Sequence, residues 1–200
     1  MDRSRFDDLK RFFEKEKYAN LISWAIWDDN DIEDLSMFDD QYLKETLPKL
    51  KDHIVIMGLN ASDNAENVKK TWAGFHNKHQ GGRDSWLREI VKLHPYLEGA
   101  YMTDVFKIVE SKSDNVKELI RDKTFRSEQY DMLERELNIL GDNLTIILIG
   151  RDAQKYFCLF EKEKDKAGLY RLLNIPHYAG RLSKAAFLKK VEIIVHEINQ

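Results

Sequence analysis

The chain has 200 residues, of which 42% are hydrophobic and 34% charged, and its 32 basic and 35 acidic side chains give a net charge of −3. This size and composition fit one globular domain with a sizeable core and argue against a disordered chain. No apolar run approaches the roughly 18 residues of a membrane span, and the N-terminus lacks the apolar stretch of a signal peptide. We therefore expect a cytoplasmic protein with no membrane partner.

Residues 4–17 place aromatic and leucine side chains at helical spacing between charged ones, which predicts an amphipathic helix. The compact apolar run 21–27 fits a strand or a buried helix, and the pattern does not decide between them. The acidic segment 28–40 follows. This segment is expected to be a loop that leads from N-terminal helical structure to the sheet core. Residues 1–50 as a whole are the predicted N-terminal helical extension.

From residue 53 onward, short β-branched runs alternate with turns and helical patterns. Strands are predicted at 53–57, 100–106, 143–149 and about 173–175, and helices at 83–97, 124–140, the stretch through 156–159, and 183–198. Asp152 is placed to cap the helix after the third strand. Continuous apolar strands between helices indicate a sheet buried on both faces. The predicted fold class is α/β, a single-domain three-layer α/β/α sandwich whose core, residues 51–200, has a central, mostly parallel sheet of about four strands.

Ligands of an open parallel sheet bind outside the carboxyl ends of its strands, where the loops turn into helices. Polar and small residues occupy these positions here: Asn60, Ala61 and Ser62 after the first strand, Thr103 and Asp104 in the second, Gly150 and Arg151 after the third, and His177 and Tyr178 after the fourth. A binding or catalytic site is therefore expected at this edge.

Several familiar sites are not supported. The chain has no G-x-G-x-x-G pattern after Gly58, no P-loop motif and no G-x-S-x-G around Ser62, which disfavours dinucleotide, P-loop and serine-hydrolase chemistry. His76 and His79 are spaced to share a metal but lack a convincing third ligand nearby. The single cysteine, Cys158, allows neither an internal disulfide nor a structural zinc site, so a reducing compartment and no metal are expected.

The carboxyl-end residues resemble the uracil-DNA glycosylase superfamily along most of residues 53–199. The resemblance is carried by Gly58-Leu59-Asn60-Ala61-Ser62, Phe75, the run Tyr101 to Lys107, and His177-Tyr178-Ala179-Gly180-Arg181-Leu182-Ser183. Gly82-Arg83-Asp84-Ser85-Trp86 is also similar to a helix start of the mismatch-specific members. The resemblance implies that Asn60 orients the attacking water and that His177 stabilises the leaving base.

Further roles are implied by the same resemblance. Phe75, Asp104 and Ser62 are the expected base-binding residues, because a base flipped from the duplex is stacked and read in a pocket. Arg181, Leu182, Ser183 and Lys184 are the expected DNA-binding residues, with Arg181-Leu182 as a wedge. Ordinary structural roles remain open for each: a turn for Asn60, core packing for Phe75, loop bracing for Asp104 and solvated charge for Arg181.

The chain also departs from the superfamily pattern. Ala61 replaces the proline of the first motif, Tyr178 stands where proline is usual in the second, and Asp104 stands where many members have a base-reading asparagine. An ionised aspartate only accepts hydrogen bonds, whereas asparagine both donates and accepts, so activity on uracil itself is in doubt.

Three functions follow from these observations. The leading prediction is a DNA glycosylase without metal or organic cofactor that excises a deaminated or damaged base, uracil or a related one. The second is an inactive nucleic-acid-binding module of the same fold, and the third is an α/β enzyme acting on a nucleoside or sugar. For DNA binding, we expect Arg181 and Lys184 to form a basic rim beside the site and the acidic segment 28–40 to lie away from it.

Overall fold

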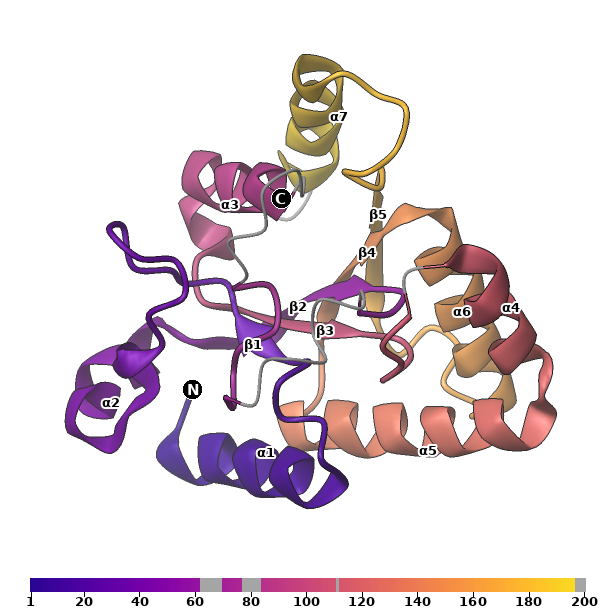
Figure 1. The fold of residues 1–200 in the computed structure, drawn as a ribbon, viewed down its shortest axis with the longest axis horizontal. Helices are drawn as coiled ribbons and strands as arrows, with labels where there is room; N and C mark the ends of the chain where they lie inside the picture. The colour runs from indigo at the N-terminus through magenta and orange to yellow at the C-terminus, as the bar shows by residue number, and fades with distance from the viewer. Residues whose placement is uncertain (62–69, 77–83, 111, 197–200) are drawn as a thin grey trace.

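The computed structural model describes residues 1–61, 70–76, 84–110 and 112–196 (Figure 1). Its strands are β1 (Ser23–Trp24), β2 (Lys51–Gly58), β3 (Ala100–Asp104), β4 (Thr145–Ile149) and β5 (Arg171–Ile175). Its α-helices are α1 (Arg3–Glu16), α2 (Asp40–Thr46), α3 (Asp84–Leu93), α4 (Ser113–Arg121), α5 (Lys123–Leu140), α6 (Gly150–Glu163) and α7 (Lys184–His196). Short 3-10 turns add η1 (Ser36–Phe38), η2 (Leu47–Lys49) and η4 (Pro95–Leu97).

The five strands form one sheet in the order β1-β3-β2-β4-β5. The pairs β2–β3, β2–β4 and β4–β5 are parallel, and only β1 runs antiparallel, beside β3. The central strands β2 and β4 are the continuous apolar runs of the sequence, whereas β5 at the edge has exposed residues among its buried ones. The predicted α/β class and mostly parallel sheet are confirmed, and the sheet has one strand more than the four expected.

Helices cover both faces of the sheet, so the predicted three layers are present (Figure 1). On one face, α1, α4, α5 and α6 pack with alternate strand residues such as Val55, Tyr101 and Ile146. On the other face, α3 and α7 pack with the intervening residues, including Ile56 and Met102. We call these the α5 face and the α3/α7 face. Because strand side chains alternate between faces, each residue at the carboxyl edge is assigned to one face by its position.

The N-terminal residues contribute to this core. Phe6, Leu9 and Phe13 of α1 are buried in the same hydrophobic cluster as strand residues of the α5 face. The predicted helix over 4–17 is confirmed within one residue at each end. The undecided run 21–27 contributes β1, whose Ser23 and Trp24 pair with Met102 and Tyr101.

Some predicted boundaries are wrong for identifiable reasons. The helix expected over 83–97 ends at Leu93, because a residue before proline is driven from the helical conformation and His94 precedes Pro95. Asp152 does not cap α6, since that helix begins at Gly150 and Asp152 already lies in its first turn. Helices α2 and α4 were not predicted. Among the described residues, no helix is both long and apolar enough to cross a membrane.

Candidate functional site at the carboxyl edge of the sheet

The register of the sheet brings the four parallel strand ends to one edge. Gly58 at the end of β2 pairs with Asp104 at the end of β3, and Ile149 at the end of β4 pairs with Ile175 at the end of β5. The segments that leave this edge carry Asn60, Asp104, Gly150 and His177. These four residues therefore lie at the same edge of the sheet.

Asp104 is buried on the α3/α7 side of this edge and leans across β2. Its side chain is 3% exposed, and a Cβ added at Gly58 would lie 2.3 Å from its Oδ1 atom. Only glycine at position 58 leaves room for this carboxylate. Asp104 is thus paired with Gly58, two residues before Asn60 in the sequence, and its Oδ1 atom lies over the end of β2.

The amide of Asn60 has a fixed orientation. Its Nδ2 donates to the backbone carbonyl of Ala61 at 2.9 Å and to that of Glu110 at 2.7 Å. Carbonyl oxygens only accept, so the NH2 side of the amide faces them and both of its protons are used. The side-chain oxygen is consequently turned the other way, as an acceptor for a water molecule requires. The same bonds also tie two loops together, which is the turn role left open from the sequence.

The segment after Asn60 is held by backbone bonds to the segment after β3. Ala61 donates its N–H to Ile108 at 3.1 Å and accepts from the N–H of Glu110 at 3.1 Å, forming an isolated parallel bridge with Val109. Proline has no N–H and could not make the first of these bonds. At Ala61 the loop is therefore held by a backbone hydrogen bond that a proline at this position would exclude.

His177 is exposed and has a defined tautomer. The backbone N–H of Ala179 donates to its Nδ1 at 3.0 Å, so Nδ1 is the acceptor and the neutral ring carries its proton on Nε2. The ring packs on Tyr178, with centroids 4.8 Å apart. Gly150 supports its other side: a Cβ at position 150 would lie 3.0 Å from the His177 Cβ. His177 thus lies at the start of α6, and Nε2 is the donor atom of its ring.

Three aromatic and apolar side chains named in the resemblance pack against the α3/α7 face. Phe75, Tyr178 and Leu182 are each half-buried against this one cluster. Phe75 has a φ of +63°, an unfavourable conformation for a non-glycine residue. Its carbonyl accepts from Trp27 Nε1 at 3.3 Å. Phe75 thus packs against the core, and stacking of its ring on a flipped base stays a prediction.

The expected DNA-binding residues differ in their surroundings. Arg181 is exposed, whereas Leu182 is half-buried. The hydroxyl of Ser183 accepts from the N–H of Ala186 at 3.3 Å, which caps the start of α7. Lys184 is ion-paired with Glu89 of α3. Ser62, the remaining expected base-binding residue, lies outside the described residues.

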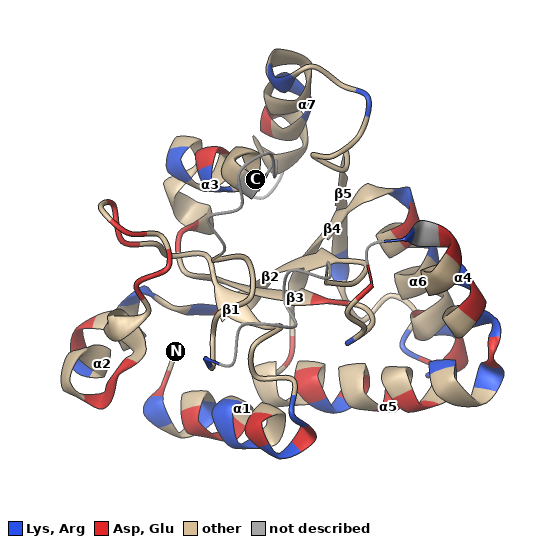
Figure 2. Cartoon of the chain, in the orientation of Figure 1, with Lys and Arg blue, Asp and Glu red and all other residues tan. Residues whose placement is uncertain are grey.

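The acidic segment 28–40 lies beside β1, at the opposite edge of the sheet from β5. Asp29 pairs with Lys92 at 3.0 Å, and the carbonyl of Ile32 lies 3.0 Å from Nδ1 of His76. Figure 2 shows this acidic loop near α2 and α3, on the other side of the view from the β5–α7 loop that carries His177. The acidic segment therefore lies away from the loop that carries His177, and it contacts His76, the residue after Phe75.

Within the described residues, His76 has a structural role. It is 2% exposed and lies between the carbonyls of Ile32 and Trp24 at 3.0 and 3.4 Å. Burial is the main cause that lowers its pKa from 6.5 to about 4, so the ring is neutral at physiological pH. His79 lies outside the described residues, and those described contain no cluster of three potential metal ligands.

A buried charged network beneath the site was missed by the sequence reasoning. Lys107 and Glu136 form an ion pair at 2.7 Å with side chains 2% and 0% exposed. The sequence contains one indication of it, because Glu136 interrupts the apolar face of α5 beside Leu133, Leu137 and Leu140. A carboxylate at such a position needs a buried partner.

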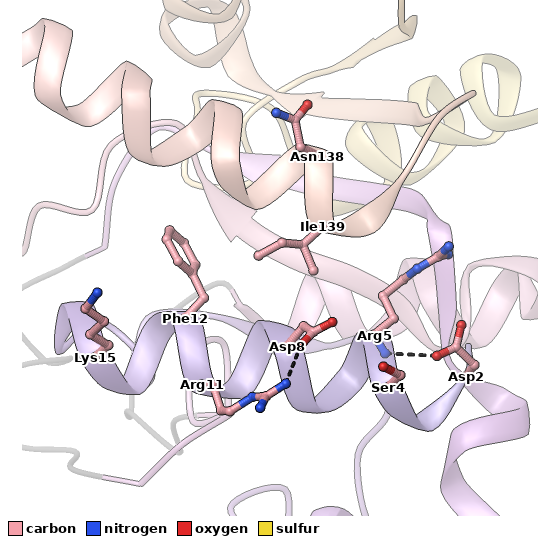
Figure 3. A pocket seen from close by; sticks show the side chains of 9 residues that line it. All are labelled: Asp2, Ser4, Arg5, Asp8, Arg11, Phe12, Lys15, Asn138 and Ile139. Atoms are coloured by element: carbon pink, nitrogen blue, oxygen red, sulfur yellow. Dashed lines mark hydrogen bonds and ion pairs between the residues drawn. The ribbon is translucent and has the colours of Figure 1, made fainter.

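A surface hollow lies away from this edge, between α1 and α5. Figure 3 shows the residues that line it: Asp2, Ser4, Arg5, Asp8, Arg11, Phe12, Lys15, Asn138 and Ile139. Several of its polar groups are used locally: Asp2 caps α1 through the N–H of Arg5, and Arg11 pairs with Asp8. We therefore assign no function to this hollow.

The fold and the site together define a three-layer α/β protein with a polar site at the carboxyl edge of a parallel sheet. The protein-family model of the uracil DNA glycosylase superfamily matches residues 38–196. The chain belongs to the uracil DNA glycosylase superfamily, and the resemblance drawn from its motifs is confirmed. No curated protein matches the chain.

Proposed function

We propose that the protein is a monofunctional DNA glycosylase, which hydrolyses the N-glycosidic bond of a deaminated or damaged base flipped out of DNA. Membership of the superfamily supports DNA as the partner. The observation that carries the proposal is the pair of fixed polar groups at one sheet edge, the outward acceptor of Asn60 and the Nε2–H donor of His177. These are the two groups that the reaction needs.

Cleavage of the bond passes through an oxocarbenium-like sugar and an anionic base. Asn60 orients a water molecule through its side-chain oxygen, and the water oxygen bonds to C1′ as the bond from C1′ to the base nitrogen breaks. The bond electrons leave with the base, and a water proton ends on it or in the solvent. His177 donates a hydrogen bond to the oxygen on which negative charge develops, an interaction whose loss typically costs about 10²–10³-fold in rate.

The charges around the edge support binding of a polyanion. Arg181 is exposed, and the helices α6 and α7 begin at this edge, where their N-terminal N–H groups favour phosphate. Because Lys184 is already paired with Glu89, Arg181 is the stronger candidate for a phosphate contact. Leu182 would have to leave its contacts on the α3/α7 face to act as a wedge.

The test uses single- and double-stranded oligonucleotides that carry uracil, hypoxanthine or xanthine, with abasic sites detected by alkaline cleavage. We expect the wild-type protein to convert at least one of them, and Asn60→Ala and His177→Ala to slow conversion with little change in DNA affinity. Salt-dependent binding without conversion of any substrate would instead establish the inactive binding module. Neither binding nor conversion would point to a small-molecule ligand at the same edge.

A further inference from the structure

The buried network is centred on the end of β3 that carries Asp104. The ammonium group of Lys107 contacts Thr103 Oγ1 at 2.7 Å, the backbone oxygen of Asp104 at 2.6 Å and Glu136 Oε2 at 2.7 Å. The Thr103 and Asp104 oxygens accept hydrogen bonds from this ammonium group, whereas its contact with Glu136 Oε2 is an ion pair without hydrogen-bond geometry. Glu136 Oε1 in turn accepts from the hydroxyls of Tyr101 and Thr103, both at 2.7 Å.

Helix α5 holds this strand end from a second position. Gln129, one of its buried residues, accepts the backbone N–H of Lys107 at 2.7 Å. The ring of Phe13 from α1 lies 5.7 Å from the Lys107 ammonium nitrogen and helps to seal it from solvent. Residues 103–107 are therefore fixed to α5 at both a side chain and a backbone atom.

Stability alone gives a weak reason for such a pair. Removing two charges from water offsets most of their attraction, and well-packed apolar residues often serve the fold equally well. What an apolar pair cannot do is donate to the Asp104 carbonyl and to Thr103 at once. The feature that the network adds to the fold is a fixed peptide at Asp104.

We propose that the Lys107–Glu136 pair is a positioning device that holds the carboxyl end of β3, and with it the Asp104 side chain, at the candidate site. Neither residue touches the α3/α7 side of the edge, because Thr103 and Asp104 point to opposite faces and the network lies on the Thr103 side. Lys107 acts through the backbone of Asp104. The effect of this positioning on base release rests on the proposed function, whereas its effect on the backbone does not.

The experiment compares the full-length protein with a double variant, Lys107→Met with Glu136→Gln, which removes both charges and keeps an acceptor for Tyr101 and Thr103. Glu163→Gln is the control, because it breaks another ion pair of α5, that with Arg126. Single-turnover base release by the double variant should fall by on the order of 10²-fold, the usual effect of a displacement of about 1 Å at a reacting group. DNA affinity should stay the same, and the control should match the wild type.

Hydrogen exchange provides a readout that is independent of activity. The N–H groups of Val105 and Phe106 donate to Gly58 and Leu59, both at 3.0 Å, and report on the strand end directly. In the double variant their exchange should accelerate by about tenfold more than that of the β4 amides, which measure the stability of the sheet. If the double variant does not fold, two variants of Thr103 serve instead. Thr103→Val should show slower base release and faster exchange at the end of β3, and Thr103→Ser should behave like the wild type.

Two results would overturn the proposal. One is wild-type base release by a folded double variant, and the other is an equal acceleration of exchange in β4 and at the end of β3, which would show a loss of global stability only. If the wild-type protein releases no base from any substrate, the proposed function falls. The exchange comparison then decides the positioning role by itself.

Discussion

Gly150 offers a test of how closely the position of His177 controls the reaction. It has a φ of +87°, and a Cβ at this position would lie 3.0 Å from the His177 Cβ and 3.2 Å from its Cδ2. Ordinary contacts begin at 3.4 Å, so Gly150→Ala must move the imidazole by about 0.4 Å or shift the start of α6. Since a 1 Å displacement of a reacting group costs about 10²-fold, we expect a loss of base release of several-fold to about tenfold.

Gly168→Ala is the matched control, because Gly168 has a φ of +78° with no atom within 4 Å of an added Cβ. Both alanines bear the left-handed penalty of about 1–2 kcal/mol, which thermal or denaturant unfolding measures. Only Gly150→Ala should also slow single-turnover base release. The rate is measured with protein in excess over DNA and at concentrations above the Kd, so that binding is saturated. If both variants lose the same stability and Gly150→Ala keeps the wild-type rate, contact with Gly150 does not set the position of His177 for the proposed reaction.

Three further outcomes are expected. Gly58→Ala would place its Cβ 2.3 Å from the Asp104 carboxylate. It should therefore lower the free energy of unfolding by about 1–3 kcal/mol and alter the preference among substrate bases. An unchanged preference would show that Asp104 does not take part in base recognition. Folding lowers the pKa of His76 to about 4, so the unfolded chain binds a proton at His76 at a higher pH than the folded protein does. The free energy of unfolding should therefore fall by up to about 3 kcal/mol as pH drops from 6.5 to 4. Unfolding titrations of His76→Gln should lack this dependence on pH. Arg181→Ala should weaken DNA binding and reduce the salt slope by about one, more than Lys184→Ala does, with the chemical step intact; equal effects of the two variants in salt titrations would contradict the assigned ion pair.

The mostly parallel sheet was predictable because its strands are strongly apolar and alternate with helices, whereas the strand order β1-β3-β2-β4-β5 was not predicted. Residues 146–149 are apolar without interruption, as a strand covered on both faces requires, and they lie in β4, between β2 and β5. The run 21–27 could not be assigned from its own residues, since its conformation depends on pairing with β3. Tertiary contacts decided between strand and helix there.

The site was predictable only in part. Topology placed Asn60, Asp104 and His177 at one edge, because parallel strands end together. The hydrogen bond to His177 Nδ1 and the exclusion of a side chain at Gly58 depend on atomic contacts that no spacing encodes. The network of Lys107 and Glu136 joins residues far apart in sequence, and only the interrupted apolar stripe of α5 hinted at it.

The central claim is that the edge holding Asn60 and His177 hydrolyses an N-glycosidic bond. Its most direct test is the release of free base, detected by mass spectrometry, from the damaged oligonucleotides under single-turnover conditions. The wild-type protein should release base from at least one substrate, whereas Asn60→Ala combined with His177→Ala, purified in the same way, should fall to background while it still binds that DNA. Equal release by the wild type and the double variant, or none by the wild type from any substrate, would contradict the account.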